Sequence, residues 1–445
     1  MKKKILFIGD LRICQNYGAI ATTESLIKMI QKEYPMADIK YIDFRSMEHP
    51  TPPKGWDSVQ NENKSPKERK RYYRWFIRTF FKYLLPYGVV VRYKRRVENT
   101  SREYIPNFSY HVPFLYKDYE TWAERITRGE VFQYEKGLLQ WADVVLINGE
   151  GNIVHGIDAN GVYRHRTLYI LFLAWLAKVK YQKPTCIVNH VVDPDSLDAV
   201  EIIKDVYPKL DRIVVRDPIS REKLISYGIN NAEYAPDALF SYIGKNIWTQ
   251  SEALKQQIDF EKPYILVGDS SGFQNAYSHI QWNIPYYMEQ LIHRLQNIIP
   301  QVVFVDGYNG SNGEINSVIE RTHIGYVNLN NCSWEDLYQV MKGAAIFISG
   351  RWHASILSIL AGTPILCFGA DSHKTRSIYT ILHYKYHFYE TASLPIHIDE
   401  LVEEACKIVN NQKEIRADIQ KKTIKLREQS LQNVLCLQGF LSCKH

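Results

Sequence analysis

Short apolar runs alternate with helical segments along most of this 445-residue chain. The runs have the length of buried strands, and the segments between them carry apolar residues at helical spacing. Strands joined through a helix lie parallel in a sheet, because the connection returns the chain to the edge where it started. The pattern therefore predicts an α/β protein with parallel sheets covered by helices on both faces. The predicted strands span residues 4–10, 38–44, 143–151, 185–193, 211–217, 264–272, 302–310, 344–350 and 364–370.

The predicted strands form two series that separate near residue 240. Single hydrophobic cores stop growing near ~250–300 residues, so a chain of this length is expected to form two domains. We predict a Rossmann-like N-terminal domain at 1–240 and a Rossmann-like C-terminal domain at 241–445, facing each other across a central cleft. A charged helical tail at 398–435 ends the second domain, and its sequence is compatible with packing on either domain.

A basic and aromatic insertion at 46–137 interrupts the first series. Its segment 64–102 holds 13 lysines and arginines and two glutamates. The net positive charge of this segment alone is therefore larger than the formal net charge of the whole chain, which is +7. Within it, RYYRWFIRTFFKYLL (71–85) places basic residues along one side of a helix and aromatic residues on the others. Such a helix suits an anionic membrane surface, and equally a helix packed on its own domain with its arginines in water. No RNA- or DNA-binding motif accompanies it, so we expect no nucleic-acid partner.

The composition narrows the classes of protein further. Hydrophobic residues make up 45% of the chain and charged residues 23%, as in ordinary globular proteins, and no apolar run approaches the ~18 residues of a transmembrane helix. The seven cysteines never form a CxxC pair, which predicts reduced thiols in a cytoplasmic protein and no cysteine-bound metal. The absence of HExxH, GxxxxGKS and GxxxxGKT disfavours a zinc hydrolase and a P-loop enzyme.

The sharpest candidate site lies in FISGRWHASILSILAGTPILCFG (347–369), where Arg351 and His353 stand between a strand and a helix. Ligands of open parallel sheets bind beyond the carboxyl ends of the strands. The free N–H groups and the dipole of a helix N-terminus favour an anion there, and the planar donor fork of arginine suits phosphate or carboxylate. The alternative is a surface arginine beside a histidine that caps its own turn.

A second arginine, Arg216, ends a strand of the first series in the same way, before the helix start DPISREKL (217–224). Two strand-end arginines in opposite halves of the chain would form a clamp on one doubly charged ligand. Taken alone, Arg216 is equally compatible with a salt bridge.

Other polar residues at predicted strand ends complete the candidates. Glu150 lies in the glycine-rich corner NGEGN (148–152), which allows close backbone approach, although a structural role is equally compatible. His190 ends the next strand and also fits a hydrogen-bonded core histidine. The remaining strand-end residues include Asn16, Gly18, Asn148, Asn189, Asp217, Asp269 and Asp306.

Taken together, four stretches resemble the polysaccharide pyruvyl transferase family. The most specific is the strand–Gly–Arg–x–His–helix–Gly–Thr–Pro element, with Lys374 shortly after the final strand. Where the family's first loop often has two glycines and an acidic residue, this chain has only Gly18 before AIATTE. The matching stretches are QNYGAIATTESLI (15–27), ADVVLINGEGN (142–152), RIVVRDPISREKLISYGI (212–229) with APDALFS (235–241), and AAIFISGRWHASILSILAGTPILCFGADSHKT (344–375).

The resemblance implies an architecture similar to that of B-type glycosyltransferases. It also implies an enzyme that moves the enolpyruvyl unit of phosphoenolpyruvate onto a sugar of a surface polysaccharide or its precursor, as a ketal, and releases phosphate. No metal and no cofactor beyond this donor substrate is implied. By resemblance, His353 and Glu150 are expected to be catalytic, and the expected substrate-binding residues are Arg351, Arg216, Lys374, His190, Asn16 and Gly18.

The expected partners are phosphoenolpyruvate and a sugar or lipid-linked oligosaccharide acceptor. The expected location is the cytoplasm, with a peripheral contact to the inner face of the membrane through 64–102. Two alternatives remain. One is a nucleotide-sugar glycosyltransferase of the same architecture, with Arg351 and Lys374 on a diphosphate and Asp371 or Asp306 on a ribose. The other is a catalytically degenerate scaffold in polysaccharide assembly.

Overall fold

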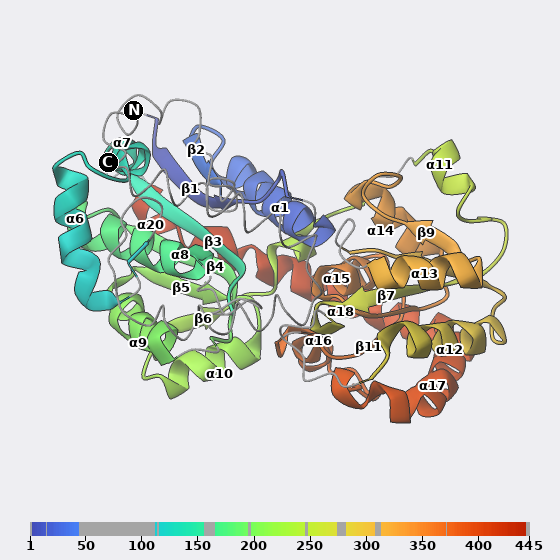
Figure 1. Cartoon of the computed structure of the whole chain (residues 1–445). Coiled ribbons are helices and arrows are strands. Elements are labelled where there is room, and N and C mark those ends of the chain that lie inside the picture. The colour runs from blue at the N-terminus through green and yellow to red at the C-terminus, as the bar shows by residue number, and fades with distance from the viewer. Residues whose placement is uncertain are drawn as a thin grey trace, which may run out of the picture. The chain divides into compact units, whose positions relative to one another are not determined.

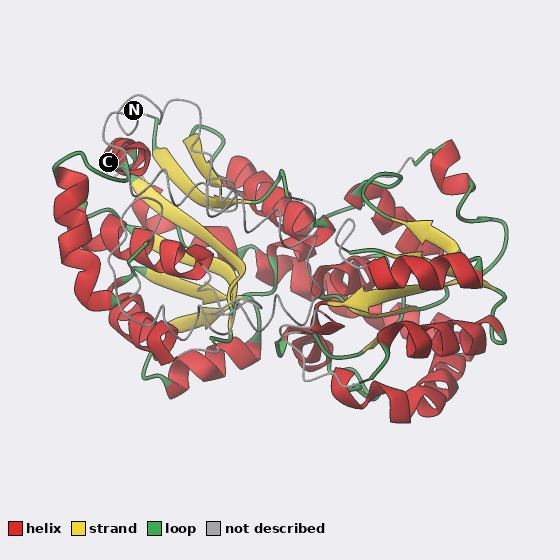
Figure 2. Cartoon of the chain, viewed as in Figure 1, coloured by secondary structure: helices red, strands yellow, loops and turns green. Residues whose placement is uncertain are grey.

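The strands within the described residues form two parallel sheets, each surrounded by helices (Figure 2). A computed structural model provides the coordinates. The basic segment 64–102, with its predicted membrane contact, lies outside the described residues, as does Asp371. The structure describes residues 2–14, 16–43, 112–113, 115–154, 165–194, 197–244, 248–273, 282–307, 313–370 and 372–441.

The first sheet has six strands in the order β2-β1-β3-β4-β5-β6, and all neighbouring pairs are parallel. The order reverses between β1 and β3, because β2 adds to one side of β1 and the later strands add to the other. The strands are β1 (Lys4–Asp10), β2 (Asp38–Asp43), β3 (Val144–Ile153), β4 (Thr185–Val192), β5 (Arg212–Val215) and β6 (Ala232–Tyr234).

The second sheet has five parallel strands in the order β11-β10-β7-β8-β9, and its order reverses between β7 and β10. The α/β prediction with two parallel, Rossmann-like sheets is therefore confirmed. Sequence patterning did not predict β6 and β9, because only one of the three residues in each strand is buried, whereas the equally short edge strand β11 is buried throughout. The strands are β7 (Tyr264–Ser270), β8 (Gln301–Val305), β9 (Gly325–Val327), β10 (Phe347–Gly350) and β11 (Ile365–Cys367).

The helices follow the strands along the chain, as the alternating pattern predicts (Figure 1). In the first half they are α1 (Tyr17–Glu33), α6 (Tyr119–Thr127), α7 (Gln133–Trp141), α8 (His165–Trp175), α9 (Leu197–Val206) and α10 (Pro218–Ser226). In the second half they are α11 (Glu252–Lys255), α12 (Ile284–Gln296), α13 (Gly313–Thr322), α14 (Trp334–Gly343), α15 (Trp352–Leu360), α16 (Lys374–Leu382), α17 (Ile398–Asn410), α18 (Gln412–Ser430), α19 (Gln432–Leu435) and α20 (Gln438–Leu441).

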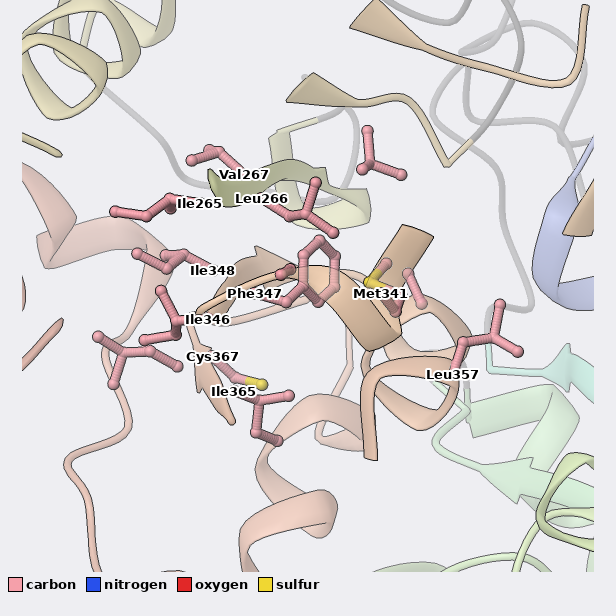
Figure 3. Close-up of a cluster of buried hydrophobic side chains, with 14 of the residues drawn as sticks. Ile265, Leu266, Val267, Met341, Ile346, Phe347, Ile348, Leu357, Ile365 and Cys367 are labelled. Carbon is pink, nitrogen blue, oxygen red and sulfur yellow. The ribbon is translucent and has the colours of Figure 1, made fainter. Parts of the chain in front are cut away.

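The second sheet is covered on both faces. Consecutive residues of β10, Phe347 and Ile348, are both buried, although adjacent side chains on a strand point to opposite faces. Figure 3 shows these residues beside Leu266 and Val267 of β7, the neighbouring strand, and Leu357 of α15 among the buried side chains. The buried strand leaves polar residues only at its carboxyl end, and this position presents Arg351 and His353.

The end of the C-terminal tail, α19 and α20, packs on the first sheet, whereas α17 and α18 contribute Leu401 and Ile419 to the buried cluster of the second sheet. Val434 and Leu437 belong to the same buried cluster as Ile5 and Val144. Asn433 donates from Nδ2 to the backbone oxygen of Pro236 at 2.8 Å. The sequence left the position of the tail open, and these contacts settle it for α19 and α20. Over the part of the chain that the structure describes, no helix has both the length and the hydropathy of a membrane span.

Candidate functional site

The candidate residues lie where the strand order of each sheet reverses. Such reversal points are where ligands bind to open parallel sheets, outside the carboxyl ends of the strands. In the first sheet, Glu150 lies near the end of β3 and Gly18 begins the helix after β1. In the second sheet, Arg351 follows β10, and its neighbour Asp269 lies near the end of β7. These four residues therefore lie where the rule places a ligand in each sheet, whereas Arg216 follows β5.

The imidazole of His353 lies in a cluster with side chains that follow strands of the first sheet. Its Nε2 is 3.1 Å from Nη1 of Arg216, 3.4 Å from Oε1 of Glu150 and 3.5 Å from Oδ2 of Asp237. The Nη1 of Arg216 also donates to Glu150 Oε1 at 3.3 Å and to Asp237 Oδ2 at 3.0 Å. The four groups therefore share one small volume, and His353 is the member that comes from the second half of the chain.

The surroundings of His353 act in opposite directions on a proton at Nε2. A guanidinium can only donate, so the contact with Arg216 requires an unprotonated Nε2. The carboxylates of Glu150 and Asp237 can only accept when ionised, so they favour a protonated Nε2. The cluster thus contains a hydrogen-bond partner for Nε2 of His353 both with and without a proton. A group that donates and accepts a proton during a reaction needs such partners.

Both carboxylates of the cluster are held in the ionised form. Burial opposes the charge of Asp237, but the charge of Arg216, the nearby His353 and the hydrogen bond from Thr22 outweigh burial and hold the pKa of Asp237 below its usual range. Burial likewise opposes ionisation of Glu150, and the charges of Arg216 and His353 lower its pKa overall. Arg216 thus contacts both carboxylates and supplies the positive charge nearest to them.

A chain of buried hydrogen bonds fixes Asp237 in place. Thr22 donates from Oγ1 to Asp237 Oδ1 at 2.6 Å and accepts from Nδ2 of Asn189 at 3.0 Å. Asn189 also donates to Asn148 Oδ1 at 3.0 Å, and Asn148 donates to the backbone oxygen of Gly9 at 3.1 Å. These four side chains are fully buried. Because each member of the chain has partners, the network is rigid and ties the carboxylate to β1, β3 and β4.

The backbone is strained at two neighbouring positions of the site. Glu150 has a φ of 45° and Asn189 a φ of 55°, in the left-handed region that glycine tolerates best. Asparagine enters this region more readily than glutamate, and residues held there cost about 1–3 kcal/mol each. Such strain persists only where the surrounding structure imposes it, and here it accompanies the glycines on each side of Glu150.

Gly18 is required by the position of His353. A Cβ at Gly18 would lie 2.1 Å from Nδ1 and 2.3 Å from Cβ of His353, so α1 can approach the imidazole only without a side chain there. Asn16 caps α1, because its Oδ1 accepts from the backbone nitrogens of Gly18 at 2.9 Å and Ala19 at 3.2 Å. Both residues therefore shape the site, and direct substrate binding by either stays a prediction.

Arg351 is paired with a carboxylate of its own sheet. Its Nε donates to Asp269 Oδ1 at 2.7 Å, and its Nη2 donates to Asp269 Oδ2. Its side chain lies against Gly307, where an added Cβ would meet it at 3.2 Å. The bidentate pair uses one edge of the guanidinium, and Nη1 belongs to the opposite edge.

A second cluster precedes Lys374, the first residue of α16. His373 lies between two carboxylates of the first half, with Nε2 3.0 Å from Asp217 Oδ1 and Nδ1 3.2 Å from Asp193 Oδ2. Burial opposes the imidazolium, but its contacts with these two carboxylates outweigh burial and raise the pKa of His373 to about 9. The charge of Lys374 contributes to the low pKa of Glu150, which links this end of α16 to the first cluster.

His190 is fully buried and bonds to Tyr207, with 3.0 Å between Nε2 and the phenolic oxygen. Burial, reinforced by the charge of Arg216, lowers the pKa of His190 to about 3, so its ring is neutral. These are the features of the core-histidine alternative, and substrate binding by His190 stays a prediction.

The structure thus brings together four of the predicted residues: His353, Glu150, Arg216 and Gly18. Sequence reasoning missed the most connected member of the cluster, Asp237. It follows the three-residue strand β6, which has no periodic signal, although it lies within the stretch APDALFS that carried the family resemblance.

Comparison with solved structures defines the class of fold. The chain is similar to UGT89C1 of Arabidopsis thaliana, solved with UDP-L-rhamnose, with 11% identity, a TM-score of 0.51 and coverage of 99% of this chain and 98% of that one. It is also similar to UGT71G1 of Medicago truncatula, solved with UDP-glucose (10% identity, TM-score 0.50, 99% of each chain), and to HepE of Anabaena, solved with UDP and glucose (12% identity, TM-score 0.50, 98% of each chain). The protein therefore has the fold of B-type glycosyltransferases.

The sequence places the chain more narrowly within that class. The model of the polysaccharide pyruvyl transferase family matches residues 16–372, and the chain belongs to this family. A comparison with curated proteins found no match. Family membership supports a pyruvyl transfer role in polysaccharide biosynthesis, with a polysaccharide or sugar as acceptor.

Proposed function

We propose that the protein transfers the enolpyruvyl group of phosphoenolpyruvate to a sugar of a surface polysaccharide or its precursor, forms a pyruvate ketal and releases phosphate. The observation that carries the proposal is the placement of His353 Nε2 within 3.5 Å of Glu150, Asp237 and Arg216. This chemistry needs one group that donates a proton to a carbon atom. It also needs oxygen groups that accept protons from the sugar hydroxyls. The cluster combines both kinds of group at the N-terminus of α15.

The donor is small and carries a phosphate and a carboxylate, so it requires several positive groups close together. Arg351 is the N-cap residue of α15, where free backbone N–H groups and the helix dipole also favour an anion. We assign the phosphate to Arg351 and this helix terminus, and the carboxylate to Lys374 at the start of α16. Two hydrogen bonds to Asp269 fix the orientation of the Arg351 guanidinium.

Arg216 has a different environment, because its side chain is only 1% exposed and its Nη1 contacts two carboxylates. A group so deeply buried contributes through its charge and its hold on His353 and Glu150. Its role as a direct donor ligand stays a prediction. Its Nε is buried without a hydrogen-bond partner among the described residues, which provides a donor for a polar atom that enters the cluster.

The proposed reaction consists of two successive additions of a sugar hydroxyl to C2 of the donor, and its atoms and electrons balance. Protonated His353 donates its proton to the methylene carbon of the donor, whose double-bond electrons form the new C–H bond and leave an oxocarbenium-like centre at C2. A sugar hydroxyl adds to C2 and loses a proton, which Glu150 or the neutral His353 accepts. The C2–O bond to phosphate then breaks and its electron pair leaves with the phosphate. A second hydroxyl adds to C2, and its proton accounts for the hydrogen phosphate that is released.

The test is phosphate release from phosphoenolpyruvate with a panel of glycans, followed by mass analysis of the product. The expected product is heavier than the acceptor by one pyruvate ketal, and His353→Gln should lose at least 100-fold in rate, since general acid–base groups contribute about 10²–10⁴-fold. The matched control is His293→Gln, which removes an exposed histidine of α12 and should retain full activity. Full turnover in His353→Gln would contradict the assignment.

Nucleotide sugars form the second arm of this test. The similar structures UGT71G1 and UGT89C1 hold UDP-glucose and UDP-L-rhamnose. Thermal shifts with phosphoenolpyruvate and with UDP-, GDP- and CMP-sugars separate the two donor classes. A large shift with a nucleotide sugar and none with phosphoenolpyruvate would replace the proposal by glycosyl transfer.

A further inference from the structure

Asp237 forms hydrogen bonds both to α15 and to residues that follow strands of the first sheet. Its Oδ2 accepts from Nη1 of Arg216 and from the indole Nε1 of Trp352, each at 3.0 Å. Its Oδ1 accepts from Thr22 Oγ1 at 2.6 Å and from the backbone nitrogen of Leu239 at 2.9 Å. Both oxygens therefore have two donors each, and the carboxylate is fully buried. A carboxylate saturated in this way cannot itself reach a substrate, but it can fix the groups that do.

Trp352 transmits this constraint to the histidine. It is the first residue of α15 and directly precedes His353. Its indole is buried, its Nε1 donates to Asp237, and the guanidinium carbon of Arg216 lies 5.2 Å from its ring centroid. The first turn of α15 is thus fixed by one hydrogen bond and one cation–π contact, both to groups of the first half of the chain.

We propose that Asp237 is a positioning residue for the transfer reaction: through Trp352 and Arg216 it sets the orientation of the His353 imidazole. This inference rests on the proposed role of His353 as proton donor. The direct distance from Asp237 Oδ2 to His353 Nε2 is 3.5 Å, longer than an ordinary hydrogen bond, so the main action of Asp237 passes through its two other partners. A reacting group displaced by about 1 Å loses about 10²-fold in rate, so small rotations of the ring matter.

The first variant is Trp352→Phe, which keeps an aromatic ring under Arg216 and removes only the indole N–H. We expect kcat for phosphate release to fall about tenfold and KM for phosphoenolpyruvate to stay within twofold, because one oriented hydrogen bond is worth about 1.5 kcal/mol. Trp248→Phe is the matched control. The indole of Trp248 donates to Asp336 at 2.9 Å, away from the cluster, and its loss should leave kcat unchanged.

The second variant, Asp237→Asn, removes the charge as well as the orientation. The charged groups that face His353 are Glu150 from β3, Arg216 after β5 and Asp237 after β6, while Gly18 of α1 brings none. Because Asp237→Asn also alters the hydrogen bonds to Arg216 and Trp352, we expect kcat for phosphate release to fall at least tenfold while KM for phosphoenolpyruvate stays within twofold. A purely structural role would lower thermal stability and leave kcat of the folded protein unchanged.

If Asp237→Asn does not fold, Thr22→Val replaces it, because it removes the donor to Oδ1 and keeps both charges. A crystal structure of Trp352→Phe provides a readout that needs no acceptor, and we expect the His353 ring to leave its position beside Arg216 and Glu150. An unmoved ring, or unchanged kcat in both Trp352→Phe and Thr22→Val, would overturn the inference. Full activity of His353→Gln would instead overturn the proposed function, so the two failures are distinguishable.

Discussion

The tie between His373 and the first half of the chain should make the stability of the protein depend on pH. His373 precedes α16 and lies 3.0 Å from Asp217 Oδ1 and 3.2 Å from Asp193 Oδ2. These contacts outweigh burial and raise its pKa from 6.5 to about 9. Because the folded pKa is higher than the unfolded one, the stabilisation is complete below pH 6.5 and is lost as the pH rises through 9.

The size of the effect follows from the same values. A difference of about 2.5 pKa units at 1.36 kcal/mol per unit amounts to about 3 kcal/mol of unfolding free energy. The side chain of His373 is 11% exposed, so solvent screens the pair little. The pKa values of Asp193 and Asp217 are lowered by the same contacts, and these carboxylates remain ionised throughout the window from pH 6 to pH 10.

The assay is urea unfolding between pH 6 and pH 10, followed by far-UV circular dichroism, for the wild type and His373→Gln. The difference in unfolding free energy between the two proteins should shrink by about 3 kcal/mol across this range, since all other titrating groups are common to both. In the control His293→Gln, the side chain is 51% exposed and 3.9 Å from Glu289, so the difference should change by only a few tenths of a kcal/mol. Parallel curves for wild type and His373→Gln would refute the reasoning.

Three further substitutions test the site. Gly18→Ala places a Cβ 2.1 Å from Nδ1 of His353, so we expect a loss of about 1–3 kcal/mol in unfolding free energy and a fall in turnover of at least tenfold, and normal turnover would show that the helix can move aside. Arg351→Lys loses the bidentate contact with Asp269 and should raise KM for phosphoenolpyruvate at least tenfold, which initial-rate measurements check. Tyr207→Phe removes the buried partner of His190, and we expect it to lower the unfolding free energy by about 1 kcal/mol and to leave KM for phosphoenolpyruvate unchanged. A raised KM would indicate that His190 takes part in substrate binding.

The sequence by itself determined the architecture and predicted candidate site residues at the ends of strands. Alternating apolar runs and helical periodicity are local signals, and they located nine of the described strands because most of these strands are buried on both faces. In open parallel sheets, the carboxyl ends of strands gather at one edge, so Glu150, Arg351 and His353 could be recognised as polar interruptions of apolar runs. The edge strands β6 and β9 have only one buried residue each and therefore give no such signal.

Only the tertiary structure decided which of these residues are partners. The link from Thr22 to Asp237 joins residues 215 positions apart, and that from Arg216 to His353 spans 137 positions. A sequence pattern reports which face of its own element a residue occupies, whereas a hydrogen bond between distant elements depends on how those elements pack. For this reason the sequence left open whether Arg216 is a donor ligand or a salt-bridge partner, and its burial beside two carboxylates emerged only from the packing. The contacts of Asp237 with Arg216 and Trp352 likewise depend on how α15 packs against the first sheet.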